Sequence, residues 1–147
     1  MLVARKLTLD ERLRGVDTQV RSGQVTAICG PNGAGKSTLI RLFAGVLSPS
    51  YGEVLLDGEL TADIHPRVRA RALGYLPQEP QIAWDLSVRN LVSLGRLAHG
   101  DTHAEPVEAA LEAMDMHDFA QRPVSTLSGG ERARALLARV LAGEPRF

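Results

Sequence analysis

The pattern of hydrophobic and polar positions changes its period along the chain, and each change marks a predicted element. Residues 2–9 and 13–20 are short segments with some two-residue alternation. Residues 25–29 form a compact run rich in β-branched side chains, which is typical of a buried parallel strand. Apolar residues then recur at helical spacing over residues 36–46. The N-terminal part therefore predicts extended segments followed by an amphipathic helix.

The rest of the chain predicts two more strands and a helical block. The strands are expected over residues 53–56, which end in an Asp-Gly turn, and over residues 72–76. Residues 67–71 predict an exposed basic helical turn, and residues 80–85 predict a loop. Helical spacing then returns in three segments, namely residues 88–97, 106–114 and 128–142. Strands mixed with helices in this way place the chain in the α/β class.

Residues that favour helix starts stand at the beginning of each late helix. Ser87 can cap the first of them. Pro106 is expected to open the second, because proline is tolerated at the first helical position. Ser128 begins the third.

The composition fits one globular domain. The chain has 147 residues, 44% of them hydrophobic and 23% charged. Its formal net charge is zero, so no basic surface indicates nucleic-acid binding at the level of the whole chain. No apolar run approaches the roughly 18 to 20 residues of a membrane-spanning helix, and no signal peptide is expected. A membrane role would therefore come through a partner.

Cys29 is the only cysteine, so no internal disulfide can form and a reducing, cytoplasmic setting is expected. We expect its side chain to be a small buried hydrophobic group at the end of a strand.

A glycine-rich loop at residues 30–37 matches the phosphate-binding pattern G-x-x-x-x-G-K-[ST] at every fixed position. Glycine lets the backbone wrap around phosphate oxygens with its N–H groups pointing inward, and the helix that starts here adds the positive end of its dipole. Lys36 supplies charge to the β- and γ-phosphates, and the Ser37 hydroxyl can ligate Mg²⁺. The predicted nucleotide-binding residues are Gly30, Pro31, Asn32, Gly33, Ala34, Gly35, Lys36, Ser37 and Thr38.

A second glycine-containing segment opens the last predicted helix and consists of Leu127, Ser128, Gly129, Gly130 and Glu131. Ser128 and Glu131 satisfy the S-x-x-E pattern of a capping box. Two glycines are poor helix formers for a first turn. Their presence is explained if a phosphate has to approach the bare N–H groups.

Together these motifs resemble the ATP-binding cassette (ABC) ATPase family, in which a phosphate loop, a glutamine loop and a signature follow in this order. Residues 75–78, with the sequence Tyr-Leu-Pro-Gln, resemble the glutamine loop. Glu131 stands where many members carry glutamine. The resemblance covers essentially the whole chain and implies a P-loop NTPase with a RecA-like parallel sheet core, a small β subdomain and a helical signature subdomain, incomplete at the C-terminus. The core and β subdomain would span about residues 1–79 and the helical subdomain about residues 80–142.

The resemblance also implies roles and partners. Two such domains would face each other head to tail, so Ser128 and Gly130 would contact the γ-phosphate of the ATP held by the partner. Gln78 would reach Mg²⁺ and the attacking water, which makes Gln78 the catalytic candidate and makes Ser37 and Gln78 the Mg²⁺ candidates. The implied cofactors are ATP and Mg²⁺. The implied partners are a second copy, transmembrane permease subunits and, indirectly, a substrate-binding protein, and no nucleic acid is expected. The implied location is cytoplasmic, on the inner face of the cell membrane.

One segment favours a branch of the family. Residues 84–96, which end in Leu-Gly-Arg, resemble the segment after the glutamine loop in importers of metal chelates such as siderophores, haem and cobalamin. A generic helix that docks another permease is the alternative. Relatives that act in DNA repair and chromosome structure insert a long coiled coil before the signature, whereas the short span from Gln78 to Ser128 contains no heptads.

The sequence departs from the family in the region that should hold adenine. Members carry an aromatic residue in the early strands, but residues 1–42 contain no Phe, Tyr or Trp. Residues 9–13 stand roughly where that residue would be. Adenine is therefore expected to stack on Arg12 or pack on an aliphatic side chain, with loose base selectivity.

A second departure concerns hydrolysis. After Phe147 the family continues with an apolar strand that ends in Asp-Glu and, further on, a switch histidine. The four histidines of this chain all precede the signature: His65, His99, His103 and His117. The spacing of His99 and His103 does not indicate a metal site, because the residues around Gly100 predict a loop.

We therefore expect the central sheet to lack strands, and expect the 147-residue chain to bind Mg-ATP weakly, if at all, without appreciable hydrolysis. Two hypotheses stay open, and a non-transport ABC ATPase is a weaker third. In one, the intact gene product is an ATP-hydrolysing subunit that powers a chelate importer. In the other, the short chain is a catalytically inactive nucleotide-binding remnant.

Overall fold

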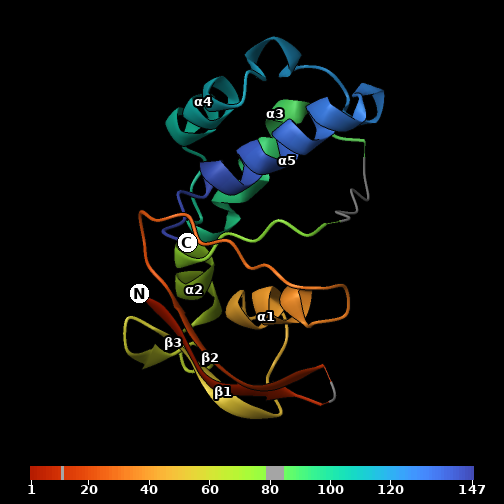
Figure 1. Cartoon of the computed structure of the whole chain (residues 1–147). Coiled ribbons are helices and arrows are strands. Elements are labelled where there is room, and N and C mark those ends of the chain that lie inside the picture. Colours follow the sequence, from red (N-terminus) through yellow and green to blue (C-terminus); the bar gives the residue numbers. More distant parts are fainter. Residues whose placement is uncertain (11, 79–84) are drawn as a thin grey trace. The chain divides into compact units, whose positions relative to one another are not determined.

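The computed structural model describes residues 1–10, 12–78 and 85–147 (Figure 1). They form two compact units, Met1–Arg69 with Arg146–Phe147 and Ala70–Pro145. Most of the loop expected over residues 80–85 lies outside the described residues. None of the described helices is both long enough and apolar enough to span a bilayer.

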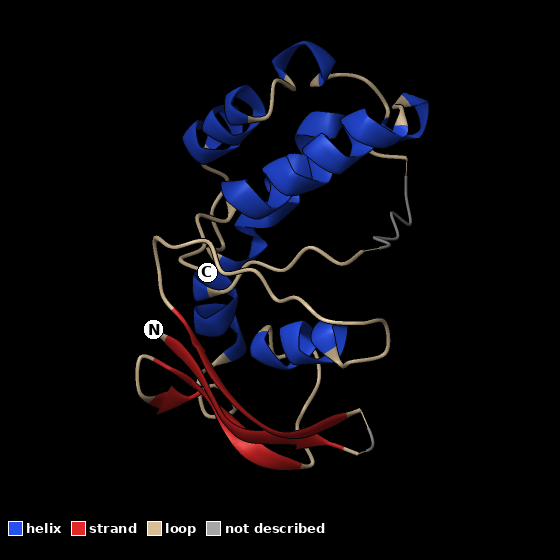
Figure 2. Cartoon of the chain, in the orientation of Figure 1, coloured by secondary structure: helices blue, strands red, loops and turns tan. Residues whose placement is uncertain are grey.

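The first unit contains a four-stranded antiparallel sheet with the order β2-β1-β3-β4 (Figure 2). Its strands are β1 (Leu2–Leu9), β2 (Leu13–Val20), β3 (Tyr51–Leu56) and β4 (Glu59–Leu60). The predicted Asp-Gly turn joins β3 to β4, and both of its residues have positive φ, 53° and 95°, as a two-residue hairpin turn requires.

Helix α1 (Lys36–Phe43) belongs to the same unit and ends three residues earlier than predicted. Its apolar stripe is buried at Leu39, Leu42 and Phe43, which confirms the predicted face within the helix. Val46, the fourth residue of the predicted stripe, lies beyond the helix and is exposed. The basic helical turn is also confirmed, as α2 (Pro66–Ala72), which buries none of its residues.

Two predicted strands are wrong. Residues 25–29 and 73–76 pair with no strand among the described residues, and Ala72 is the last residue of α2. A parallel strand exists only through hydrogen bonds to neighbouring strands, and the described sheet is antiparallel throughout. For the same reason Val25 is fully exposed, and Cys29 is exposed instead of buried. The mixed α/β class itself holds.

The second unit is helical. It contains α3 (Val88–Ser93), η1 (Leu94–Ala98), α4 (Ala104–Ala113), η2 (His117–Phe119), η3 (Val124–Thr126) and α5 (Gly129–Ala142). Ser87 caps α3 by accepting a hydrogen bond from the Asn90 N–H at 3.2 Å, as predicted. Helix α4 begins at Ala104, two residues before the predicted start, so Pro106 lies within the first turn, where its missing N–H still costs no hydrogen bond.

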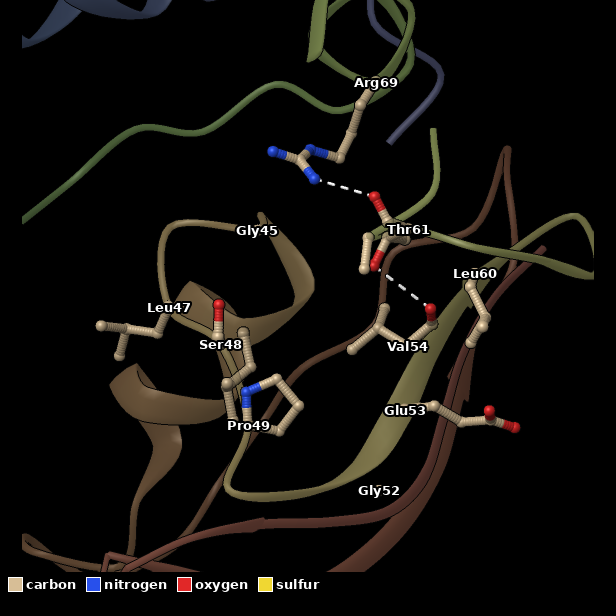
Figure 3. Close-up of a pocket in the computed structure, with 12 residues that line it drawn as sticks. Gly45, Leu47, Ser48, Pro49, Gly52, Glu53, Val54, Leu60, Thr61 and Arg69 are labelled. Carbon is tan, nitrogen blue, oxygen red and sulfur yellow. Dashed lines mark hydrogen bonds between the residues drawn. The ribbon is translucent and has the colours of Figure 1, made fainter. Parts of the chain in front are cut away.

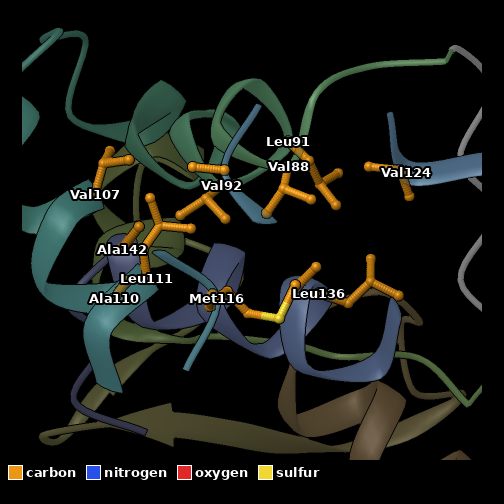
Figure 4. Close-up of a cluster of buried hydrophobic side chains, with 13 residues drawn as sticks. Val88, Leu91, Val92, Val107, Ala110, Leu111, Met116, Val124, Leu136 and Ala142 are labelled. Carbon is orange, nitrogen blue, oxygen red and sulfur yellow. The ribbon is translucent and has the colours of Figure 1, made fainter. Parts of the chain in front are cut away.

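One apolar cluster holds these helices together (Figure 4). Val88, Leu91 and Val92 of α3 face Leu111 of α4 and Leu136 of α5. Met116 fills the space among the helices and is completely buried. The predicted face of the second late helix is confirmed, because Val107, Ala110 and Leu111 are buried and Met114 packs against the cluster.

Candidate nucleotide-binding site

The phosphate loop, residues 30–37, lies in the first unit and leads directly into α1. Gly33 and Gly35 both have φ 83°, a left-handed conformation that glycine adopts without strain. Gly35 is also the N-cap of α1, and no side chain caps this helix. The first N–H groups of α1 thus lack the side-chain acceptor that most helices provide, which leaves them available to an anion.

The Lys36 side chain closes over the loop. Its Nζ donates to the carbonyl oxygens of Gly30 at 2.8 Å and of Pro31 at 2.7 Å. Two carbonyls at the start of the loop therefore hold the ammonium, and phosphate oxygens could replace them as acceptors. Ser37 is exposed beside it and Thr38 is half-buried.

The signature, residues 127–131, lies in the second unit at the start of α5. The Ser128 N–H donates to Glu131 Oε2 at 2.7 Å, and Ser128 Oγ accepts from the Glu131 N–H at 3.3 Å. This is the predicted capping box, and it is confirmed.

The two signature glycines have no packing role within the described chain. A Cβ atom added to Gly129 or Gly130 would meet nothing within 4 Å, and neither residue has positive φ. Each glycine costs a helix roughly 1 kcal/mol relative to alanine. The first turn of α5 therefore has a bare backbone that the fold of this unit does not require.

Gln78 shares a hollow with the start of α5. The hollow has a volume of about 350 Å³, and its lining includes Gln78, Gly129 and Arg132. The structure thus brings the glutamine-loop candidate and the signature together within the second unit, while the phosphate loop belongs to the first.

The ionisation of Glu131 gives a test of the capping box. The Ser128 N–H and hydroxyl, followed by Arg122 and Arg134, lower the pKa of the Glu131 carboxyl below its ordinary 4.5. Because the folded-state pKa of Glu131 lies below its unfolded value, the ionised carboxylate stabilises the fold fully above the unfolded pKa. This stabilisation is lost as the pH falls through the lowered folded-state pKa.

Glu131→Gln should therefore reduce the loss of stability in acid, because the glutamine oxygen can still accept from the Ser128 N–H without titrating. The measurement is the urea midpoint at neutral and at acid pH. Glu112→Gln, at an exposed position of α4, is the matched control and should leave the acid dependence unchanged. An unaltered acid dependence in Glu131→Gln would show that this carboxylate contributes nothing.

Arg96 holds the far end of the signature helix, a role that the sequence pattern did not reveal. It is only 5% exposed. Its Nη1 donates to the carbonyl oxygen of Ala142, the last residue of α5, at 3.1 Å and to Glu144 Oε2 at 2.6 Å. Its Nε and Nη2 donate to the Asp101 carboxylate at 3.0 and 2.7 Å. The pKa of Arg96 is raised and that of Asp101 lowered, in both cases mainly by this hydrogen-bonded pair. The end of the signature helix is thus fixed by a buried cation, which also suits the negative end of the helix dipole.

Gly95 allows this arrangement. A Cβ atom on Gly95 would lie 2.1 Å from the carbonyl oxygen of Arg139 in α5, so only glycine lets η1 approach so closely. The Leu-Gly-Arg sequence, a family pointer in the sequence, therefore has a packing function here.

The histidine pair lies beside the same region. His99 Nε2 is 2.9 Å from the carbonyl oxygen of Gly143, while the exposed His103 ring lies 3.8 Å from Asp101. Within the described ranges no group of three or more His, Cys, Asp or Glu side chains could hold a metal ion.

A further hollow of about 310 Å³ lies in the first unit between the end of α1 and strands β3 and β4 (Figure 3). Arg69 Nη1 donates to the carbonyl oxygen of Thr61 at 2.8 Å, and the Thr61 hydroxyl donates to the carbonyl oxygen of Val54 at 3.2 Å. Both of these side-chain donors therefore have partners within the chain.

A glycine-rich loop at the uncapped start of an amphipathic helix defines a phosphate-loop nucleotide-binding protein. Comparison with protein families identifies the family within this class. Residues 13–147 match the ABC transporter family, and the chain belongs to that family.

Individual relatives agree with this assignment. The chain is 47% identical to the hemin import ATP-binding protein HmuV of Pseudomonas entomophila over 138 residues, which cover 90% of this chain and 53% of that protein. It is 40% identical to HmuV of Rhizobium meliloti, with 92% and 56% covered. Among solved structures, a dimeric ABC transporter cassette matches with a TM-score of 0.84 at 25% identity and covers 99% of this chain and 71% of that chain. The chain thus spans about half the length of the curated relatives it matches.

Proposed function

We propose that the complete protein binds MgATP at the phosphate loop and hydrolyses it to power an ABC importer of a metal chelate such as haem, a siderophore or cobalamin. The observation that carries nucleotide binding is the Lys36 ammonium held across a glycine loop at the uncapped N-terminus of α1. The 47% identity to a protein named for hemin import supports the chelate class.

The phosphate-loop residues would bind and orient the nucleotide. Lys36 would exchange its carbonyl partners for oxygens of the β- and γ-phosphates, and the first N–H groups of α1 would donate to the same anion. The Ser37 hydroxyl and the Gln78 amide oxygen are exposed oxygen donors, which is the ligand type that Mg²⁺ prefers. The cation would neutralise phosphate charge when it is bound.

The signature would serve a second copy of the protein. The first turn of α5 exposes a bare backbone at Gly129 and Gly130, which fits the approach of a γ-phosphate carried by a partner. The likeness to a cassette whose structure is dimeric supports pairing with a second copy. Permease subunits would hold the dimer at the inner face of the cell membrane and would select the chelate together with a substrate-binding protein.

Hydrolysis requires the carboxylates and the histidine that the family carries beyond the signature. Sequencing the DNA downstream of the Phe147 codon tests this part of the proposal. We expect an open frame that encodes an apolar strand ending in Asp-Glu and, further on, a histidine. A stop codon directly after Phe147 would exclude hydrolysis and leave the alternative, a nucleotide-binding remnant.

The importer role has a separate test. Deletion of the gene should abolish growth on one chelate as the sole source of its metal while growth on the free metal salt is unchanged. Normal growth on every siderophore, haem and cobalamin tested would contradict the substrate class.

A further inference from the structure

The segment that leads into the signature is fixed to the start of α3. Ser87, which caps α3, and Pro123 form an antiparallel bridge. Next to this bridge the Val88 N–H donates to the carbonyl oxygen of Arg122 at 3.0 Å. Val88 and Val124 are both buried in the apolar cluster of the second unit. The backbone of Arg122 is therefore anchored, and its side chain extends from a fixed place.

The guanidinium of Arg122 contacts the signature at two points. Its Nη2 donates to the carbonyl oxygen of Thr126, the residue directly before the signature, at 3.0 Å and to the Thr126 hydroxyl oxygen at 3.5 Å. Its Nη1 lies 3.9 Å from Glu131 Oε1, while Oε2 of the same carboxylate accepts from the Ser128 N–H. The guanidinium carbon also lies over the Phe119 ring, 5.1 Å from its centroid, and Phe119 packs against the apolar cluster. One side chain thus joins both ends of the signature to the core of the unit.

The first turn of α5 needs such support because it contains Gly129 and Gly130. Glycine has more conformational freedom than any other residue, so a first turn with two glycines frays readily. Bare N–H groups bind an anion well only if they already hold one geometry, since binding otherwise has to order them. A Cβ atom on either glycine would meet nothing within 4 Å, so packing does not fix this turn. Contacts through the neighbouring residues must fix it, and Arg122 supplies them before and after the glycines.

We propose that Arg122 is a positioning residue of the signature, which holds the N–H groups in the first turn of α5 in the geometry that accepts the nucleotide of a second copy. This inference rests on the proposed function, in which the signature serves a partner. Arg122 acts through Thr126 and Glu131. A guanidinium suits this task better than an ammonium, because its planar fork can donate in two directions and stack on Phe119 at the same time. Loss of Arg122 should therefore weaken the signature and leave the phosphate loop, which belongs to the first unit, unchanged.

The experiment measures two dissociation constants of the full-length protein and its variants. One is that of MgATP, by calorimetric titration, and the other is that of self-association with a non-hydrolysable ATP analogue, by analytical ultracentrifugation. Arg122→Ala should weaken self-association about three- to tenfold, the range expected for charged hydrogen bonds that are partly exposed to solvent. It should leave MgATP affinity within about twofold of wild type, because separate sites act independently. A merely structural role would lower both affinities together.

Two further variants test how Arg122 acts. Arg122→Lys keeps the charge without the planar fork, so it should recover only a small part of the lost self-association. Arg122→Ala should also have a smaller effect in a Glu131→Gln background than in wild type, because one of its two contacts is already weakened there. Arg67→Ala is the matched control, since Arg67 is an exposed arginine of α2 in the first unit. This variant should change neither dissociation constant.

Several results would overturn the inference while leaving nucleotide binding at the phosphate loop intact. These are wild-type self-association in Arg122→Ala, full recovery in Arg122→Lys, an equal loss in Arg67→Ala, or additive effects of Arg122→Ala and Glu131→Gln. A parallel fall in the MgATP affinity of Arg122→Ala would also overturn it, because Arg122 would then support the fold as a whole. Failure of wild type to bind MgATP, or to self-associate with the analogue, would instead contradict the proposed function itself.

Discussion

Replacing Lys36 by alanine is expected to weaken MgATP binding by about 10- to 100-fold. Hydrogen bonds to charged groups contribute roughly 1.5 to 3 kcal/mol, and about 1.4 kcal/mol corresponds to a factor of ten in affinity. The ammonium already lies across the loop, on the carbonyl oxygens of Gly30 and Pro31, so binding needs only an exchange of acceptors. Calorimetric titration of the full-length protein with MgATP measures the effect.

The chain offers a matched control for this substitution. Lys6 is the only other lysine and is exposed in β1, so Lys6→Ala removes the same charge at another place in the same unit. It should leave MgATP affinity within about twofold of wild type, since a distant exposed charge is largely screened. Equal losses in both variants would show that Lys36 acts through the general field of the protein and not through contact with phosphate.

Replacing Gly35 by alanine should destabilise the fold more than any other single methyl addition in the phosphate loop. The positive φ costs an L-residue roughly 1 to 2 kcal/mol, and the new Cβ would also lie 2.4 Å from the carbonyl oxygen of Arg12, which is backbone and cannot rotate away. We expect a total loss above about 2 kcal/mol, a large part of the 5 to 15 kcal/mol that stabilises a typical domain. Urea unfolding followed by circular dichroism measures it.

Substitution of Gly33 separates the two causes of this loss, the positive φ and the close contact. It has the same φ of 83°, but a Cβ atom there would meet nothing within 4 Å. Gly33→Ala should therefore show only the cost of the backbone conformation. If the two variants lost equal stability, the close approach of the β1–β2 hairpin to the loop would have no energetic consequence.

The sequence predicted those features that depend on local rules. The capping box at Ser128, the cap at Ser87 and the two-residue turn after β3 each follow from a few neighbouring side chains, and each is present. The phosphate loop was predictable for the same reason, because fixed residue types at short spacing identify it.

Predictions that depended on distant partners did not hold. Residues 25–29 have the composition of a parallel strand, but a strand also needs neighbours, and none of the described residues provides one. The exposure of Cys29 follows from the same absence within the described chain. The roles of Gln78, Ser128 and Gly130 likewise depend on partners and stay predictions.

Arg96 illustrates a third case, in which contacts between distant residues explain a short sequence motif. Its partners lie five residues away at Asp101 and almost fifty residues away at Glu144. Periodicity cannot connect such positions. The Leu-Gly-Arg sequence marked a branch of the family, but only the structure shows that Arg96 binds the last carbonyl of α5.

The bonds at the two ends of α5 have a mechanical consequence. The capping box closes its first turn and Arg96 binds its last carbonyl, so the 14 residues of the helix should move as one rod about 21 Å long. A force on the bare first turn would then reach the Arg96 end instead of being absorbed by fraying. The signature helix is in this sense a rigid connecting element, and the buried guanidinium binds its far end.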